Sequence, residues 1–284
     1  MGGLKRSCGI RVALATSLAI AVQACIMRPG QAAEAWPAAV QARYKLKYEG
    51  IGVGHIDFTS RTTGQTYTMS SSGEVSLMFG AIRWVGSSNV SGAIEGASVA
   101  PKSYAFDWQK NKKGGAIKMG FAGKKAVDLA VEPPAKTGPE IVPLTEQHKS
   151  GVLDPLSAIM ALTRADAADP CDRRVAVFDG KQRFDIVFSF KRKTLIPAAN
   201  SGGASSVGLV CRAVYAPIAG YKADSPAKAY AANRDAEVVL RRVPSTNLLI
   251  PHSVTIPTSW GTGSMVIDRV DVTSATAGQF ALTE

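Results

Sequence analysis

Residues 151–185 have the sequence GVLDPLSAIMALTRADAADPCDRRVAVFDGKQRFD, and the first half carries the signals of a helix. Asp154 suits the N-cap, because its side-chain oxygen can accept hydrogen bonds from amides of the first turn. Pro155 suits the first helical position, where no amide donor is needed. One mostly apolar stripe follows at helical spacing: Leu156, Ile159, Met160 and Thr163. We predict a helix at about residues 154–165, which is short enough to be marginal in water and must pack on a sheet.

A hairpin is predicted directly after this helix. Asp169-Pro170 ends the helical pattern, and Asp179-Gly180 separates two apolar runs, which is a strong signal for a two-residue type I′ turn. The second run alternates apolar with polar residues and predicts a strand with one buried face. Its apolar members are Phe184, Ile186, Phe188 and Phe190.

The chain outside this stretch has the pattern of strands. Tyr44, Leu46 and Tyr48 alternate with two lysines, and similar alternations, separated by glycines, continue through residues 65–99 and 236–272. We predict a mainly β fold with one packed helix: a single curved antiparallel sheet, or an open barrel-like or spiral sheet. No repeat or low-complexity tract divides the chain, so we read residues 36–284 as one β-rich domain.

The first 35 residues have the three parts of a secretory signal peptide. Lys5, Arg6 and Arg11 precede an apolar run at residues 12–24, and a small-residue cleavage site ends at Ala35. The run is shorter than the ~20 residues that span a bilayer, which argues against a membrane anchor. The alternative is a lipoprotein signal, in which Cys25 is lipid-modified. We predict a periplasmic protein, cleaved after Ala35.

Two cysteines remain after such cleavage, Cys171 and Cys211. In an oxidising compartment an even pair predicts a disulfide. Closing a loop of this length stabilises a fold by ~4 kcal/mol in the chain-entropy model. The pair lacks the CxxC or HxxxH spacing of a zinc site, and no metal ligand set is predicted.

The charge of the chain is strongly positive. Removing residues 1–35 takes away four cations and Glu34, so the net charge falls from +11 to +8. Outside the cytoplasm this favours anionic envelope components, including lipid head groups with peripheral membrane contact, over nucleic acid. The alternative is a generic solvated basic surface. The predicted hairpin tip at Lys110, Lys112 and Lys113 has the same two interpretations.

Catalytic motifs are not evident. The histidines, His55, His148 and His252, lie in no known nucleophile motif, although a fold could assemble them with a serine and a carboxylate. Ser157 is explained by its place in the first turn of the helix. The glycines of GIGVG, residues 50–54, do not open a helix, so the dinucleotide-binding fingerprint fails and no cofactor is predicted.

Alternating charges follow the Asp-Gly pair. Lys181 and Arg183 are candidate contacts for an anionic ligand. The ordinary alternative is ion pairing across strands, in which Arg173 or Arg174 pairs with an acidic residue of the hairpin.

Several segments together resemble a bacterial family, domain of unknown function 3108. They are Tyr48–Gly54, Pro101 with Tyr104, Gly151–Ala158, Cys171, Phe178–Asp185 and Cys211. The resemblance spans nearly the whole mature chain and implies a secreted, β-rich envelope protein. It implies no catalytic or binding residues, because the family has no assigned activity.

We hypothesise a non-enzymatic periplasmic cell-envelope protein that binds a lipid-like or other apolar ligand, or an envelope protein partner. This hypothesis rests on the predicted curved sheet, on its aromatic strands and on the lack of a catalytic motif. The alternative hypothesis is an envelope hydrolase that acts on cell-wall or lipid esters.

Overall fold

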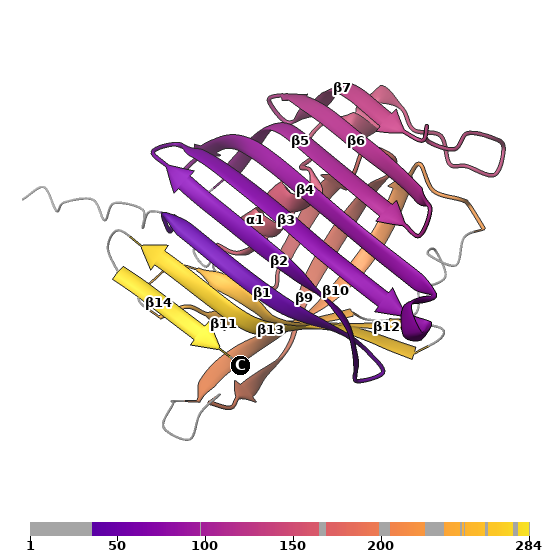
Figure 1. Cartoon of the computed structure of the whole chain (residues 1–284). Coiled ribbons are helices and arrows are strands. Elements are labelled where there is room, and N and C mark those ends of the chain that lie inside the picture. Colours follow the sequence, from indigo (N-terminus) through magenta and orange to yellow (C-terminus); the bar gives the residue numbers. More distant parts are fainter. Residues whose placement is uncertain are drawn as a thin grey trace, which may run out of the picture. The chain divides into compact units, whose positions relative to one another are not determined.

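One antiparallel sheet holds fourteen strands in the part of the chain that the structure describes (Figure 1). The structure is a computed structural model and describes residues 36–96, 98–164, 169–198, 205–224, 236–244, 246, 248–258, 261–274 and 278–283. The strands are β1 (Ala39–Tyr48), β2 (Ile51–Thr63), β3 (Thr66–Leu77), β4 (Ile82–Glu95), β5 (Ser98–Lys110), β6 (Lys113–Ala122), β7 (Lys125–Glu132), β8 (Arg173–Phe178), β9 (Arg183–Ile196), β10 (Ser206–Ala219), β11 (Ala236–Arg242), β12 (Leu249–Thr258), β13 (Gly261–Ser274) and β14 (Gly278–Thr283). The helical elements are α1 (Pro155–Leu162) and two 3-10 turns, η1 (Met78–Gly80) and η2 (Glu146–Lys149). This arrangement confirms the predicted fold class.

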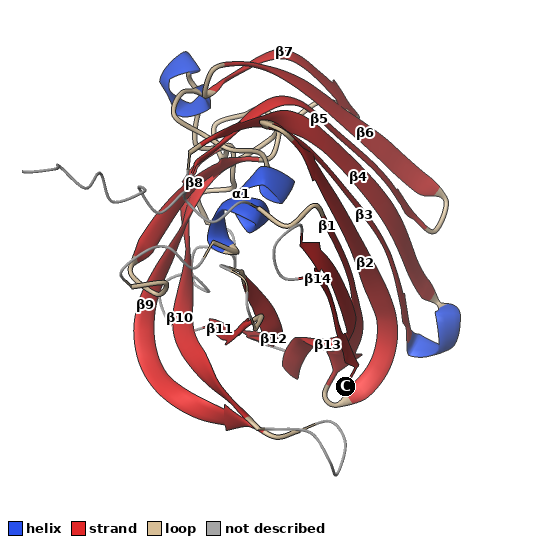
Figure 2. Cartoon of the chain, turned by 90° about the vertical axis from the view of Figure 1, so that its left-hand side faces the viewer, coloured by secondary structure: helices blue, strands red, loops and turns tan. Residues whose placement is uncertain are grey.

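The sheet follows the order β7-β6-β5-β4-β3-β2-β1-β13-β12-β11-β10-β9-β8. Strand β13 joins the two halves. One of its edges pairs with β1, and the other pairs first with β12 and then, over its second half, with β14. Strands β7 and β8 are therefore the two ends of the sheet, and the strong curvature brings these ends near each other (Figure 2).

Val152 and Leu153, which we call the closing segment, connect the two ends by backbone hydrogen bonds. The Val152 amide donates to the carbonyl of Lys124, directly before β7, at 3.1 Å. The Leu153 amide donates to Ala176 of β8 at 2.9 Å, and the Leu153 carbonyl accepts from Phe178 at 2.9 Å. The closing segment thus covers part of both edges, whose backbone groups would otherwise need other partners.

Helix α1 begins directly after the closing segment and lies inside the curve of the sheet (Figure 2). As predicted, Asp154 is the N-cap, and its Oδ1 accepts from the amides of Leu156 and Ser157 at 3.0 Å each. The Ser157 hydroxyl donates to the other carboxylate oxygen of Asp154 and shares a hydrogen bond of 2.6 Å with the Tyr67 hydroxyl. All three side chains are buried. The cap therefore also attaches the helix to β3.

The predicted helix extends to about residue 165, whereas α1 ends at Leu162. The carbonyl of Thr163 accepts from the amide of Leu249 at 2.7 Å, so the chain here pairs with the start of β12. The Arg173 guanidinium donates to the carbonyl of Ala161 at 3.1 Å. These partners occupy carbonyls of the last turn, and the chain leaves the helical path.

The hairpin after the helix is present, but the predicted type I′ turn is wrong. The loop between β8 and β9 has four residues, 179–182. The Asp179 side chain accepts from the amides of Lys181 and Gln182 at 2.8 and 2.7 Å, and of the loop residues only Gly180 has positive φ. A type I′ turn needs two central residues with positive φ. The Asp179 side chain instead organises a longer Asx turn.

Two glycines leave room for aromatic rings on the inner face of the sheet. A Cβ on Gly92 would lie 2.5 Å from the ring of Tyr67, and a Cβ on Gly86 would lie 2.5 Å from the ring of Trp84. Rings that cover strand glycines in this way are typical of strongly curved sheets. Gly92 also makes space for the ring whose hydroxyl reaches Ser157.

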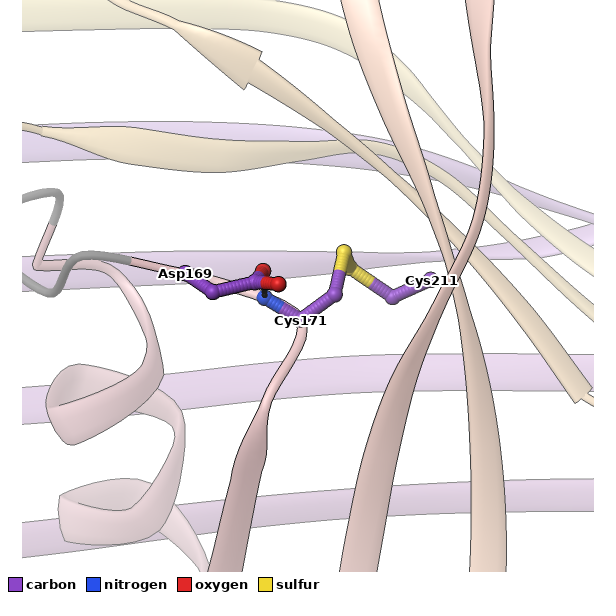
Figure 3. Close-up of a disulfide and its surroundings, with 3 residues drawn as sticks. All are labelled: Asp169, Cys171 and Cys211. Atoms are coloured by element: carbon purple, nitrogen blue, oxygen red, sulfur yellow. Dashed lines mark hydrogen bonds between the residues drawn. A yellow bond between two sulfur atoms is a disulfide. The ribbon is translucent and has the colours of Figure 1, made fainter.

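The predicted disulfide between Cys171 and Cys211 is confirmed (Figure 3). The two Cα atoms are 5.3 Å apart, and both side chains are fully buried. The Cys171 amide donates to Asp169 at 2.8 Å. Because Cys171 precedes β8 and Cys211 lies in β10, the bond ties one end of the sheet to the second strand inward.

We expect Cys171→Ala/Cys211→Ala to lower the free energy of unfolding by ~4 kcal/mol, because the unfolded chain regains the entropy of an open loop. Urea unfolding of the oxidised protein and the double variant measures this difference. The control is a reducing agent, which should destabilise the wild type and leave the variant unchanged. Equal stability of oxidised wild type and variant would contradict the expectation.

The carboxyl of Asp154 gives a second prediction. Burial raises its pKa from 3.8 to about 6, against the opposing effect of its hydrogen bonds with Ser157 and Leu156. The folded state therefore holds a proton that the unfolded state releases between these two pH values. The contribution of the protonated Asp154 carboxyl to the free energy of unfolding is complete below pH 3.8 and is lost as the pH rises through about 6. The loss is on the order of 3 kcal/mol.

We expect Asp154→Asn to remove this loss, because asparagine keeps the cap acceptor and carries no charge. Urea unfolding at about pH 4 and about pH 7 tests it: the wild type should be less stable relative to Asp154→Asn at the higher pH. Asp154→Ala is the comparison that loses the cap at both pH values. An equal pH dependence in wild type and Asp154→Asn would refute the assignment to Asp154.

Candidate functional site

An apolar cavity of about 220 Å³ lies inside the sheet, between α1 and the inner faces of strands from both halves. Its walls are Val40, Ala42 and Tyr44 of β1, Phe58, Ser60 and Thr62 of β2, Met69 of β3, Ile159, Met160 and Leu162 of α1, Phe188 of β9, Val238 and Leu240 of β11, Ile250, Pro251 and Val254 of β12 and Met265 of β13, with Trp36, Pro37, Thr163, Pro170 and Leu248. No charged side chain lines the cavity among the described residues.

The alternation of β1 explains how its side chains reach the cavity. Val40, Ala42 and Tyr44 face inward, whereas Arg43 faces outward and pairs with Asp57 at 2.7 Å. The ring of Tyr44 packs edge-on against the ring of Phe58, with centroids 5.9 Å apart, and burial raises the pKa of the Tyr44 hydroxyl. Ala42 is the smallest of these inward residues and leaves part of the space unfilled.

The size and chemistry of the cavity limit what it can hold. An apolar cavity of ~150 Å³ stays dry and binds benzene, so the larger volume here suits a ring or a short hydrocarbon chain. Pockets for drug-sized molecules are larger, at ~300–1,000 Å³. A charged group would lose its hydration without gaining a charged partner from the walls. The cavity therefore fits the apolar part of a ligand.

Polar groups lie at one boundary of the cavity, around Trp36. The indole Nε1 of Trp36 is buried and has no hydrogen-bond partner within the described part of the chain. The guanidinium of Arg164 lies over the same ring, 4.9 Å from its centroid, and is itself buried. An N–H donor and a positive charge thus lie next to an apolar volume, an arrangement that suits an amphiphile.

A second hollow, of about 840 Å³, lies on the outer face of β2–β7. Small polar side chains dominate this face, including Ser70, Asn89 and Ser91, and both signs of charge occur, with Lys118 and Asp128. Adjacent inward residues of the same strands, such as Met69, belong to the core. This groove presents a solvated polar surface, and the apolar cavity inside the sheet is the stronger candidate site.

The structure places the three histidines on separate elements. His55 lies on β2, 3.6 Å from Asp57, and His252 lies on β12. His148 lies in η2, where its Nδ1 accepts from the amide of Thr145 at 3.1 Å. Ser157 is fully buried and bonded to Asp154 and Tyr67, as described above. The geometry therefore gives the hydrolase hypothesis no cluster around Ser157.

The predicted anion contacts lie at the β8–β9 hairpin. The Arg183 guanidinium, 13% exposed, contacts the carboxylate of Asp185, which also pairs with Arg174 at 2.9 Å. These pairs match the alternative of ion pairing. Lys181 lies in the turn beside Asp179, whose pKa is raised by burial. An anion contact by Lys181 and Arg183 stays a prediction.

The main lining residues of the cavity carry no individual signal in the sequence. Trp36 directly follows the predicted cleavage site, and Ala42 is one small residue in an apolar alternation. Trp36 and Ala42 line one cavity only because the fold places both next to α1, which is distant from them in sequence. The stripe of Ile159 and Met160 was predicted to pack on a sheet, and it does so while leaving this space.

None of the helices among the described residues has both the length and the apolar character to cross a bilayer. Within the same residues, no three His, Cys, Asp or Glu side chains are grouped so that they could hold a metal ion.

These features define a class: barrel-like, antiparallel β proteins with a helix and an apolar cavity inside the sheet. The chain belongs to the family described as "Protein of unknown function (DUF3108)", whose model matches residues 43–267. The predicted family resemblance is thereby confirmed. A similar solved structure is the crystal structure of a beta-barrel-like protein of domain of unknown function DUF1849 from Brucella abortus, with a TM-score of 0.50, 11% identity, and coverage of 83% of this chain and 98% of that chain. No curated protein matches in sequence.

Proposed function

We propose that this protein is an exported, periplasmic cell-envelope protein that binds the apolar part of a lipid-like ligand inside its sheet, without catalysing a reaction. The apolar cavity between α1 and the inner faces of the strands carries the proposal. Uncharged apolar walls favour a hydrocarbon group by removing its surface from water. A barrel-like sheet is a common way to enclose such a site.

Export is supported by two independent features. The N-terminal sequence has the pattern of a signal peptide, with cations, an apolar run and a small-residue site ending at Ala35. The Cys171–Cys211 bond is of the kind that persists in oxidising compartments such as the periplasm.

The boundary at Trp36 favours an amphiphile over a plain hydrocarbon. The unpaired Trp36 N–H would donate to an oxygen of the ligand, and the apolar walls would receive a hydrocarbon group. A single-chain lipid, with its chain in the cavity and its polar end toward Trp36, satisfies both conditions. The cavity volume limits the enclosed portion to a short segment of that chain.

We expect Ala42→Phe to weaken binding of a fluorescent fatty acid, cis-parinaric acid, by about tenfold or more, because the added ring occupies the space that the chain would fill. Fluorescence titration of the purified mature protein measures the affinity. The matched control is Gln41→Phe, which adds the same ring to the exposed outer face of β1. Ser60→Leu is a smaller change of the same kind for the case in which Ala42→Phe unfolds.

Two results would contradict the proposal: a wild type that does not bind the probe, or cavity variants that bind it as tightly as Gln41→Phe does. Native mass spectrometry of protein extracted gently from the periplasm adds a direct readout. A co-purifying lipid that is reduced in Ala42→Phe supports the cavity as its site.

A further inference from the structure

Two turns at one end of the sheet expose apolar side chains that the fold does not use. Phe79 and Met78, in the β3–β4 turn, are fully and 72% exposed, and Ile51, at the β1–β2 turn, is 70% exposed. The register pairs Gly54 with Val75, so the continuing strands bring Ile51 and Met78 to the same level of the sheet. These apolar side chains therefore project from neighbouring turns.

The backbone of the β3–β4 turn directs these side chains outward. Met78, Phe79 and Gly80 have φ of 51°, 55° and 93°, three successive left-handed residues. This conformation is uncommon for large side chains and costs free energy at each non-glycine position. Burial does not compensate for it, because neither Met78 nor Phe79 packs into a core cluster among the described residues.

A basic turn is held beside this apolar turn. Asn111, in the β5–β6 turn, accepts from the amide of Arg83 at 2.8 Å and donates its own amide to the Arg83 carbonyl at 2.9 Å. Its side-chain nitrogen donates to Ala81, directly after Phe79 and Gly80, at 3.3 Å. These bonds fix the lysines that flank Asn111 next to the exposed Phe79.

Those lysines carry charge that the protein does not neutralise. Lys110, Lys112 and Lys113 are all exposed, and none forms an ion pair within the part of the chain that the structure describes. The net charge of +8 after the predicted cleavage adds a positive field. Figure 1 shows the three turns along the lower right side of the sheet, at the ends of β1, β3 and β5.

We propose that this end of the sheet, which we call the docking end, binds the surface of an anionic lipid bilayer. It comprises Ile51, Met78, Phe79, Lys110, Lys112 and Lys113. Projecting apolar side chains insert at the boundary of head groups and acyl chains, and adjacent lysines attract anionic head groups. A bilayer fits separate protruding tips, because it deforms around them and needs no matching shape, whereas a protein partner needs a complementary surface.

This docking end goes beyond the proposed function, because ligand binding in the cavity does not require it. The two proposals use different residues and different probes. Ala42→Phe changes the cavity and leaves the docking end unaltered, so it should bind vesicles as the wild type does. Failure of one proposal is therefore distinguishable from failure of the other.

The test is co-sedimentation of the full mature protein with vesicles of phosphatidylcholine, with and without phosphatidylglycerol. We expect binding to the anionic vesicles that weakens with added salt. Met78→Ser/Phe79→Ser should weaken it by about tenfold or more, since each buried apolar side chain contributes strongly. Replacing Lys110, Lys112 and Lys113 with glutamine should weaken it and reduce its salt dependence.

The matched control is Leu195→Ser, which removes an apolar side chain that is 67% exposed on β9, outside the docking end. Phe79→Trp provides a positive readout, because its fluorescence should shift to shorter wavelength on anionic vesicles, whereas that of Leu195→Trp should not. The proposal is overturned if the wild type does not sediment with anionic vesicles. It is equally overturned if Leu195→Ser and Met78→Ser/Phe79→Ser lose the same amount of binding, or if Phe79→Trp shows no shift.

Discussion

Backbone hydrogen bonds of Val152 and Leu153 connect the two ends of the sheet and set the position of the helix that follows. A sheet that does not close on itself leaves two edges with unpaired donors and acceptors. Here the closing segment supplies partners to Lys124 on one side and to Ala176 and Phe178 on the other. The helix begins at Pro155, after the single N-cap residue Asp154, so the same bonds that join the ends of the sheet also place α1 inside it. The apolar cavity is the space that remains between this helix and the inner faces of the strands.

Two buried features hold this arrangement in place. The Asp154 carboxyl caps the helix and, through Ser157, connects it to Tyr67 of β3. The disulfide ties the segment before β8 to β10. Polar groups that are buried and bonded in this way restrict the ways in which a helix can pack. Because α1 is held at its start, its apolar stripe faces the strands across a gap beside Ala42 that its own side chains do not fill.

How much of this the sequence predicts depends on whether each feature is local. The Asp154 cap, the helix stripe and the strand alternation act over a few residues, and all were predicted. The end of α1 was predicted less well, because pairing with Leu249, which is distant in sequence, decides it. The type of the β8–β9 turn was wrong although the Asp179 side chain that decides it is local, because an Asp-Gly pair suits more than one kind of turn. The closing segment pairs across long sequence distances and has no pattern of its own. The cavity is a space between elements that are distant in sequence, so no single residue, including Trp36, predicts it.

We expect the closing segment to join the two ends of the sheet in solution as well. Hydrogen–deuterium exchange of the mature protein, resolved to single amides, tests it most directly. The amides of Val152, Leu153 and Phe178 should exchange as slowly as amides in the middle of the sheet, because all three are donors in the closure. Fast exchange at these three amides, while the central strands stay protected, would contradict it.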